Sequence, residues 1–197
     1  MALRRLEWIA AALDTIAPEQ SGFLRLRSTA DSLSELVATL EESLSRHEAG
    51  YLILLDVQGA FDGLPHATTN GTLHELGVTG RLLHYIRAFL NDRTLRVRVG
   101  GPLSDPRGVF LGVPQGSDLS PFLFNLALSR LHDYIQKTTS HEVRSTIYAD
   151  YIALFACGPT EVGYLVRASI QTAVHAVEEY LATSASDSSS QPRKQRR

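Results

Sequence analysis

The sequence predicts a mixed α/β (α+β) domain in which a small antiparallel sheet is backed by helices. The apolar run at residues 51–57 has the length of a strand and reaches an acid at Asp56, as expected of a buried strand with a polar residue at its edge. Residues 143–148 and 152–156 predict two short strands around a tight turn. Apolar residues at helical spacing before and after these strands predict the helices that cover the sheet.

The composition is that of one ordinary globular domain. The 197 residues are 44% hydrophobic and 20% charged, which is enough for one domain with a core. The formal net charge is −2, so any contact with nucleic acid must come from local arginine clusters. The single cysteine, Cys157, excludes an internal disulfide and fits a reducing compartment. Neither a signal peptide nor a membrane span is predicted.

The first half of the chain contains several start and stop signals. The box Ser28-Thr29-Ala30-Asp31, followed by leucines and a valine on one face, predicts a helix that ends before Gly50. Shorter helices are predicted up to Gly77 and from Thr79. Alternation over residues 94–99 predicts a strand with one basic face, partnered by residues 109–111.

The second half begins with a loop at residues 112–117. Residues 119–134 predict one helix that is buried on more than one side, and residues 160–181 predict a last helix. The serine-rich and then basic composition of residues 182–197 predicts a disordered tail. We therefore expect an N-terminal helix within residues 1–18, the main domain at 19–181 and the tail at 182–197.

Two aspartates are candidates for a metal site. Asp56 closes the apolar strand, and Asp150 should lie at the tip of the hairpin. Each alone is ordinary strand-end or turn chemistry. Together they suit magnesium, which prefers hard oxygen ligands, and a two-metal site stabilises both the attacking and the leaving oxygen of a phosphoryl transfer.

Four motifs in order resemble the reverse transcriptase domain of non-LTR (LINE-like) retrotransposons. They are QSGFLRLRST at 20–29, LDVQGAFD at 55–62, GVPQGSDLSPFLFNLAL at 112–128 and YADYIALF at 148–155. The resemblance covers residues 19–181 and implies a polymerase palm-type fold with partial fingers and no thumb. It implies RNA-directed DNA polymerase activity, in which a primer 3'-hydroxyl attacks the α-phosphate of a deoxynucleoside triphosphate and pyrophosphate leaves.

The resemblance also implies a role for individual residues. Asp56, Asp150 and the backbone carbonyl of Val57 would bind two Mg²⁺ ions, with Mn²⁺ as a substitute. The family has a second aspartate after Asp150, whereas this chain has Tyr151, so the resemblance implies weaker metal binding and an impaired or inactive copy.

The expected nucleotide site comprises a gate and a loop. Phe61 would act as the steric gate against a ribose 2'-hydroxyl, and the loop residues against the nucleotide and template base would be Pro114, Gln115 and Gly116. Asp62 is expected to anchor a loop or to cap the next segment rather than to bind metal. Five arginines are candidates for contacts with nucleic acid, with a solvated surface as the alternative: Arg25, Arg27, Arg93, Arg96 and Arg98.

The expected partners are an RNA template, a DNA primer and deoxynucleoside triphosphates, with no membrane, in a nuclear or cytoplasmic ribonucleoprotein. The alternative function is that of a truncated, catalytically inactive retroelement remnant with at most weak nucleic-acid binding. A magnesium phosphohydrolase that uses Asp56 would leave the loop at 112–117 and the hairpin unexplained.

Overall fold

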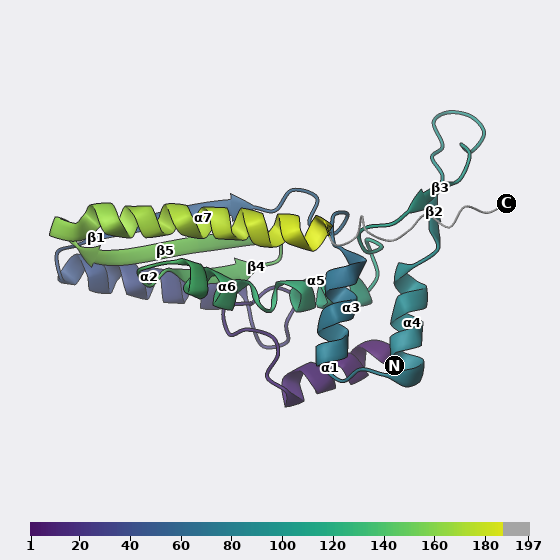
Figure 1. Ribbon diagram of the computed structural model, residues 1–197, viewed down its shortest axis with the longest axis horizontal. Helices are drawn as coiled ribbons and strands as arrows, with labels where there is room; N and C mark the ends of the chain where they lie inside the picture. Colours follow the sequence, from purple (N-terminus) through teal and green to yellow (C-terminus); the bar gives the residue numbers. More distant parts are fainter. Residues whose placement is uncertain (187–197) are drawn as a thin grey trace.

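The computed structural model describes residues 1–186. A central three-stranded sheet packs against helices (Figure 1). In chain order the elements are α1 (Ala2–Ala12), α2 (Thr29–Ser45), β1 (Glu48–Asp56), α3 (His66–Glu75), α4 (Gly80–Leu90), β2 (Arg93–Leu95), β3 (Arg107–Val109), α5 (Leu119–Leu128), α6 (Leu131–Thr138), β4 (Arg144–Tyr148), β5 (Tyr151–Pro159), the 3₁₀ turn η1 (Thr160–Val162) and α7 (Gly163–Ser186).

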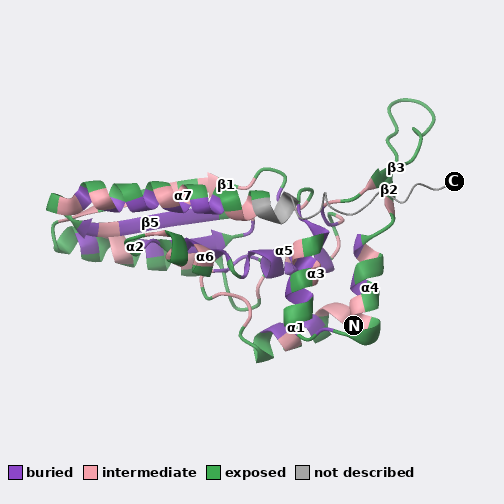
Figure 2. Cartoon of the chain, viewed as in Figure 1, coloured by how far each residue is buried: buried purple, intermediate pink, exposed green. Residues whose placement is uncertain are grey.

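The central sheet has the strand order β1-β5-β4, and both pairings are antiparallel. Helix α7 packs along β5 and β1, and α2 contacts all three strands from the other side (Figure 1). The middle strand β5 is therefore covered on both faces, and Leu154 and Phe155 are fully buried (Figure 2). The predicted antiparallel sheet backed by helices is present.

The outer strand β1 is covered less evenly than β5. Leu52 and Leu54 are 42% and 71% exposed, whereas their neighbours Ile53 and Leu55 pack against the core. This alternation follows from the pleat, which turns successive side chains to opposite faces. The face that carries Leu52 and Leu54 also carries Asp56, so this end of the sheet is open on the side away from α7.

Helix α2 begins where the sequence predicts. Ser28 and Asp31 form the predicted capping box, with the Ser28 N–H and hydroxyl both donating to the Asp31 carboxylate. Of the predicted apolar face, Leu36 is buried, but Leu33 and Val37 are more than 45% exposed. The helix therefore covers the sheet over only part of its apolar stripe.

The second sheet, β2–β3, is shorter than predicted. It pairs Arg93–Leu95 with Arg107–Val109, and the predicted strand over 94–99 does not continue past Leu95. The hairpin projects from the body (Figure 1), and Val97 and Val99 are exposed there. Because no other layer of the fold covers this hairpin, no buried face fixes its register, and the alternating pattern does not produce a longer strand.

Two helix predictions differ from the structure. The helix predicted at 119–134 is divided into α5 and α6, because the backbone turns at Ser129, whose hydroxyl donates to the Leu126 carbonyl. Helix α7 continues to Ser186, so the first part of the tail predicted to be disordered is helical. The rest of that tail, residues 187–197, lies outside the described residues.

Within residues 1–186 no helix combines the length and apolarity needed to cross a membrane.

Candidate active site

The two candidate aspartates lie at the same end of the central sheet. Asp56, the last residue of β1, is the register partner of Tyr151, the first residue of β5. Asp150 lies in the turn between β4 and β5, and its backbone carbonyl accepts a 2.8 Å hydrogen bond from the Val57 N–H. Asp56 is exposed and Asp150 is half-buried. Backbone pairing therefore brings together two residues that are 94 positions apart in the numbering (150 − 56).

The turn that carries Asp150 is fixed from outside the sheet. The Ser21 N–H donates to the Ile147 carbonyl at 2.9 Å, and the Ile147 N–H donates to the Glu19 carbonyl at 2.8 Å. Residues 19–21 thus add a short parallel pairing to the free edge of β4. A Cβ on Gly22 would lie 2.3 Å from the Ala149 nitrogen, so this position requires glycine.

The donors available at this end are all oxygens. Two carboxylates and the Val57 carbonyl suit magnesium or manganese in chemical type, although the Val57 carbonyl already accepts the Ala60 N–H at 3.2 Å. Tyr151, the residue after Asp150, is 60% exposed. Within the described part of the chain, no group of three or more His, Cys, Asp or Glu side chains is arranged to hold a metal.

Phe61 follows this end of the sheet in the chain and packs against two other aromatic rings. Its centroid is 5.1 Å from that of Phe124 on α5 and 5.9 Å from that of Phe23, with the Phe23 ring nearly perpendicular at 75°. The Phe61 carbonyl accepts the Val113 N–H at 2.8 Å. This half-buried ring is thereby joined to the loop at residues 112–117.

The loop at residues 112–117 packs closely on the segment that follows Phe61. The Gly112 N–H donates to the Leu64 carbonyl at 2.7 Å, and a Cβ on Gly112 would lie 2.5 Å from the Asp62 carbonyl oxygen. The Gln115 amide donates to the Asp62 carboxylate at 3.3 Å, so Asp62 anchors the loop. Pro114 is held through its carbonyl, which accepts the Ser120 hydroxyl at 2.6 Å, and Gly116 has φ +86° with open space around it.

The loop is also held from behind by two residues, one of which the sequence analysis missed. The Arg93 guanidinium donates to the carbonyls of Leu90, Leu111 and Gly112. His66 Nε2 lies 2.8 Å from the Gly112 carbonyl, to which it donates when it carries the ring proton. Burial lowers the pKa of His66 below its ordinary value, and the nearby Arg93 charge lowers it further. These bonds engage Nε and Nη2 of Arg93, one of the arginines predicted to contact nucleic acid.

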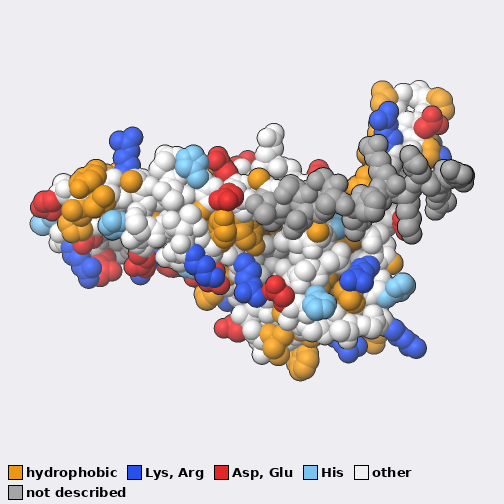
Figure 3. All heavy atoms as spheres, in the orientation of Figure 1, with side chains coloured by type: hydrophobic (Ala, Val, Ile, Leu, Met, Phe, Trp, Pro, Cys, Tyr) orange, Lys and Arg blue, Asp and Glu red, His pale blue; other side chains and the backbone are white. Residues whose placement is uncertain are grey.

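The other four candidate arginines are exposed, and they differ in their contacts. Arg27 donates to the carbonyls of Ala17, Pro18 and Gln20, so it braces its own loop. Arg96 and Arg98 belong to the projecting hairpin, where Figure 3 shows basic and hydrophobic side chains together. The structure therefore does not gather the candidate arginines into one cluster.

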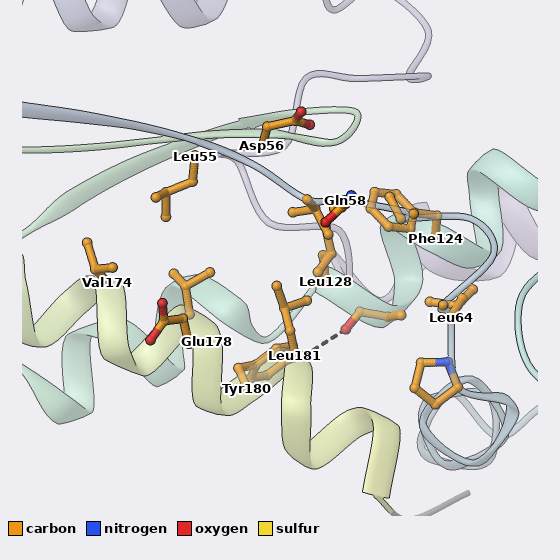
Figure 4. Close-up of a pocket in the computed structure, with 17 residues that line it drawn as sticks. Leu55, Asp56, Gln58, Leu64, Phe124, Leu128, Val174, Glu178, Tyr180 and Leu181 are labelled. Carbon is orange, nitrogen blue, oxygen red and sulfur yellow. Dashed lines mark hydrogen bonds between the residues drawn. The ribbon is translucent and has the colours of Figure 1, made fainter.

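A pocket of about 350 Å³ lies on the α7 side of the sheet (Figure 4). It is lined by β1, the following loop, α5 and α7, with Leu55, Val174 and Leu181 among its apolar walls. Asp56 contributes to its rim, but its carboxylate lies on the opposite side of the β1 ribbon from Leu55. This pocket is therefore separate from the expected nucleotide site around Phe61 and Gln115.

Comparison with known proteins connects these motifs to one family. Residues 1–190 match the family model described as "Reverse transcriptase (RNA-dependent DNA polymerase)". The chain is 34% identical over 137 residues to the Pol polyprotein of type-1 retrotransposable element R2 of Popillia japonica, a match that covers 68% of the chain and 19% of the relative. It is 28% identical over 183 residues to the RNA-directed DNA polymerase of the Drosophila melanogaster mobile element jockey, covering 91% of the chain and 19% of the relative.

A solved structure supports the fold. Apo telomerase from Candida tropicalis, truncated from its C-terminal domain, superposes with a TM-score of 0.58 at 15% identity, over 86% of this chain and 36% of the other. The chain spans about a fifth of the length of the retrotransposon relatives. The chain belongs to the reverse transcriptase (RNA-dependent DNA polymerase) family, in which its relatives are the enzymes of the non-LTR retrotransposons.

Proposed function

We propose that this chain forms the palm and part of the fingers of an RNA-directed DNA polymerase, and that Asp56 and Asp150 are its catalytic, metal-binding residues. One observation supports this most strongly. The register pair Asp56–Tyr151 and the bond from Val57 N–H to the Asp150 carbonyl hold the two aspartates at one sheet end.

In the proposed mechanism the two carboxylates and the Val57 carbonyl would hold the metal ions. Two Mg²⁺ or Mn²⁺ ions, when bound, stabilise the attacking oxygen of the primer and the leaving oxygen of the pyrophosphate. In this proposal the Phe61 ring, which packs against Phe23, excludes a ribose 2'-hydroxyl, and the Asp62–Gln115 bond orients the loop toward the nucleotide. The substrates are a DNA primer, an RNA template and deoxynucleoside triphosphates.

Tyr151 reduces the activity in this proposal. It is the β5 residue opposite Asp56, and it supplies an aromatic phenol where a carboxylate would compensate metal charge. The loss of a single preorganised electrostatic stabiliser costs on the order of a hundredfold in rate in other enzymes. We therefore propose an impaired polymerase rather than a fully active one.

The second candidate is a catalytically inactive retroelement remnant with weak nucleic-acid binding. The same tyrosine favours it, because the β5 residue opposite Asp56 is a phenol rather than a carboxylate.

Primer extension distinguishes the two candidates. The assay uses an RNA template, a DNA primer and Mn²⁺, and compares the unaltered chain with Tyr151→Asp, Tyr151→Phe and Asp150→Ala. We expect weak extension by the unaltered chain and by Tyr151→Phe, more by Tyr151→Asp, and none by Asp150→Ala. Extension that survives Asp150→Ala would refute the assigned site, and no extension even by Tyr151→Asp would favour the inactive remnant.

A further inference from the structure

We propose that Phe23 is a positioning residue for Phe61, and that it thereby helps to select 2'-deoxynucleoside over ribonucleoside triphosphates. The inference rests on the proposed function, because it identifies what holds the sugar-discriminating ring of that same site. It is supported by three features of the structure: the ring contact, the backbone at Phe23, and the bonds that fix the segment before it.

Phe61 depends on Phe23 for support on one side. The Phe124 ring, on α5, is 2% exposed and supports Phe61 from within the core. Phe23 meets Phe61 edge to face at 5.9 Å and is 53% exposed. Edge-to-face packing is a favoured aromatic geometry. Without the Phe23 ring, Phe61 would have a ring neighbour only on its Phe124 side, and its side chain could turn away from a bound sugar.

The backbone at Phe23 is held in an unfavourable conformation. Its φ is +58°, in the left-handed region that is costly for a bulky side chain. Such strain persists only when neighbouring bonds fix the chain on either side. Burial of the Phe23 ring does not account for the strain, since half of that ring is exposed. In this conformation the Phe23 ring contacts Phe61 edge to face.

Hydrogen bonds from two buried side-chain amides fix the preceding residues to α5. The Gln20 side-chain amide donates to the Asn125 backbone carbonyl at 2.9 Å, and the Asn125 side-chain amide donates to the Gly22 carbonyl at 2.7 Å. Gln20 is fully buried and Asn125 is 2% exposed. Asn125 follows Phe124 in the chain, so both rings that flank Phe61 are connected to the same turn of α5.

The same segment touches the turn that carries Asp150. Gly22 lies against the Ala149 backbone, and Ser21 bonds to Ile147. The backbone of the segment before Phe23 is therefore joined to the Asp150 turn by contacts that do not involve the Phe23 ring. A change in the Phe23 ring should alter the choice of sugar with little effect on the metal site.

Isothermal titration of the full 197-residue chain with dATP and with ATP, in buffer that contains MnCl₂, tests this proposal. The variant Phe23→Leu keeps an apolar side chain but removes the ring, and Phe23→Tyr keeps the ring. Leu26→Ala is the matched control, because Leu26 has a similar φ of +62° in the same loop and is fully exposed. Thermal melting of each variant reports whether the fold is retained.

We expect the unaltered chain to prefer dATP, and Phe23→Leu to lower that preference by roughly tenfold, mainly by binding ATP more tightly. Phe23→Tyr and Leu26→Ala should keep the preference. An unchanged preference in Phe23→Leu, or an equal loss of affinity for both nucleotides, would overturn the role of Phe23 and leave the proposed function standing. Absence of nucleotide binding by the unaltered chain would count against the proposed function itself, and the role of Phe23 would fall with it.

Discussion

Gly22 illustrates, at the scale of one residue, how closely the segments of the site approach each other. A Cβ at this position would lie 2.3 Å from a backbone nitrogen of the β4–β5 turn, which cannot move without disturbing the sheet. We predict that Gly22→Ala destabilises the protein by about 1–3 kcal/mol through overpacking. Urea unfolding measures the change. The control is Gly71→Ala in α3, where the added methyl meets nothing within 4 Å, and a similar loss in both variants would contradict the account.

His66 gives a pH-dependent prediction at the same scale. Burial lowers its pKa in the folded protein, while the unfolded chain retains the ordinary value near 6.5. The unfolded state therefore binds more protons as the pH falls below about 6.5, and the stability that His66 contributes is lost in that direction. We expect the free energy of unfolding to drop between pH 7.5 and 5.5, and to drop less in His66→Gln. An identical pH dependence in His66→Gln would show that another group is responsible.

Single residues could be predicted where a local pattern determines them. Asp56 was expected at a strand end and Asp150 at a hairpin tip, because strand periodicity and turn chemistry are read from neighbouring residues. The hydrogen bonds that hold the loop and the segment before Phe23 in place could not be predicted from the sequence. Arg93 and His66 meet Gly112, and Gln20 meets Asn125, across long stretches of sequence that carry no periodic signal.

At the scale of elements, the predicted helix and strand ranges agree with the structure where another layer of the fold packs on the segment. The helices α2 and α4 and the hairpin β4–β5 lie close to their predicted ranges, since caps and apolar periodicity agree there with packing. The strand predicted at 94–99 is reduced to β2, because the projecting hairpin packs on no other layer. The break between α5 and α6 at Ser129 was missed, because apolar residues continue across it.

Helix α5 gives a prediction for the way elements are joined. The Asn125 side chain connects α5 to the segment before Phe23 through the Gly22 carbonyl. In Asn125→Leu that buried carbonyl loses its partner, and we expect a loss of about 1–3 kcal/mol in the free energy of unfolding. Chemical denaturation measures it, with the exposed amide Gln171→Leu on α7 as control. A cost for Asn125→Leu no greater than that of the control would show that the bond is dispensable.

At the scale of the whole molecule, the two faces of the central sheet differ in how they are covered. Helix α7 lies along one face, whereas on the other α2 leaves the end with Leu54 and Asp56 exposed. Both aspartates lie at this open end, and Phe61, whose carbonyl accepts the Val113 N–H, follows β1 in the chain. Because the net charge is −2, the overall field does not favour a polyanion, so in the proposed function positive charge at this end would come from the metal ions that the two aspartates hold.

The central claim is that Asp56 and Asp150 hold metal together, and Mn²⁺ binding followed by electron paramagnetic resonance tests it most directly. The chain should bind Mn²⁺, and Asp56→Asn and Asp150→Asn should each remove that binding. Tyr151→Asp should tighten it by on the order of tenfold, since affinity for such ions rises with the number of charged ligands. Asp62→Asn is the control, because that carboxylate is bonded to Gln115 and is expected to leave metal affinity unchanged. Mn²⁺ binding that is unaffected by both Asp56→Asn and Asp150→Asn would contradict the account.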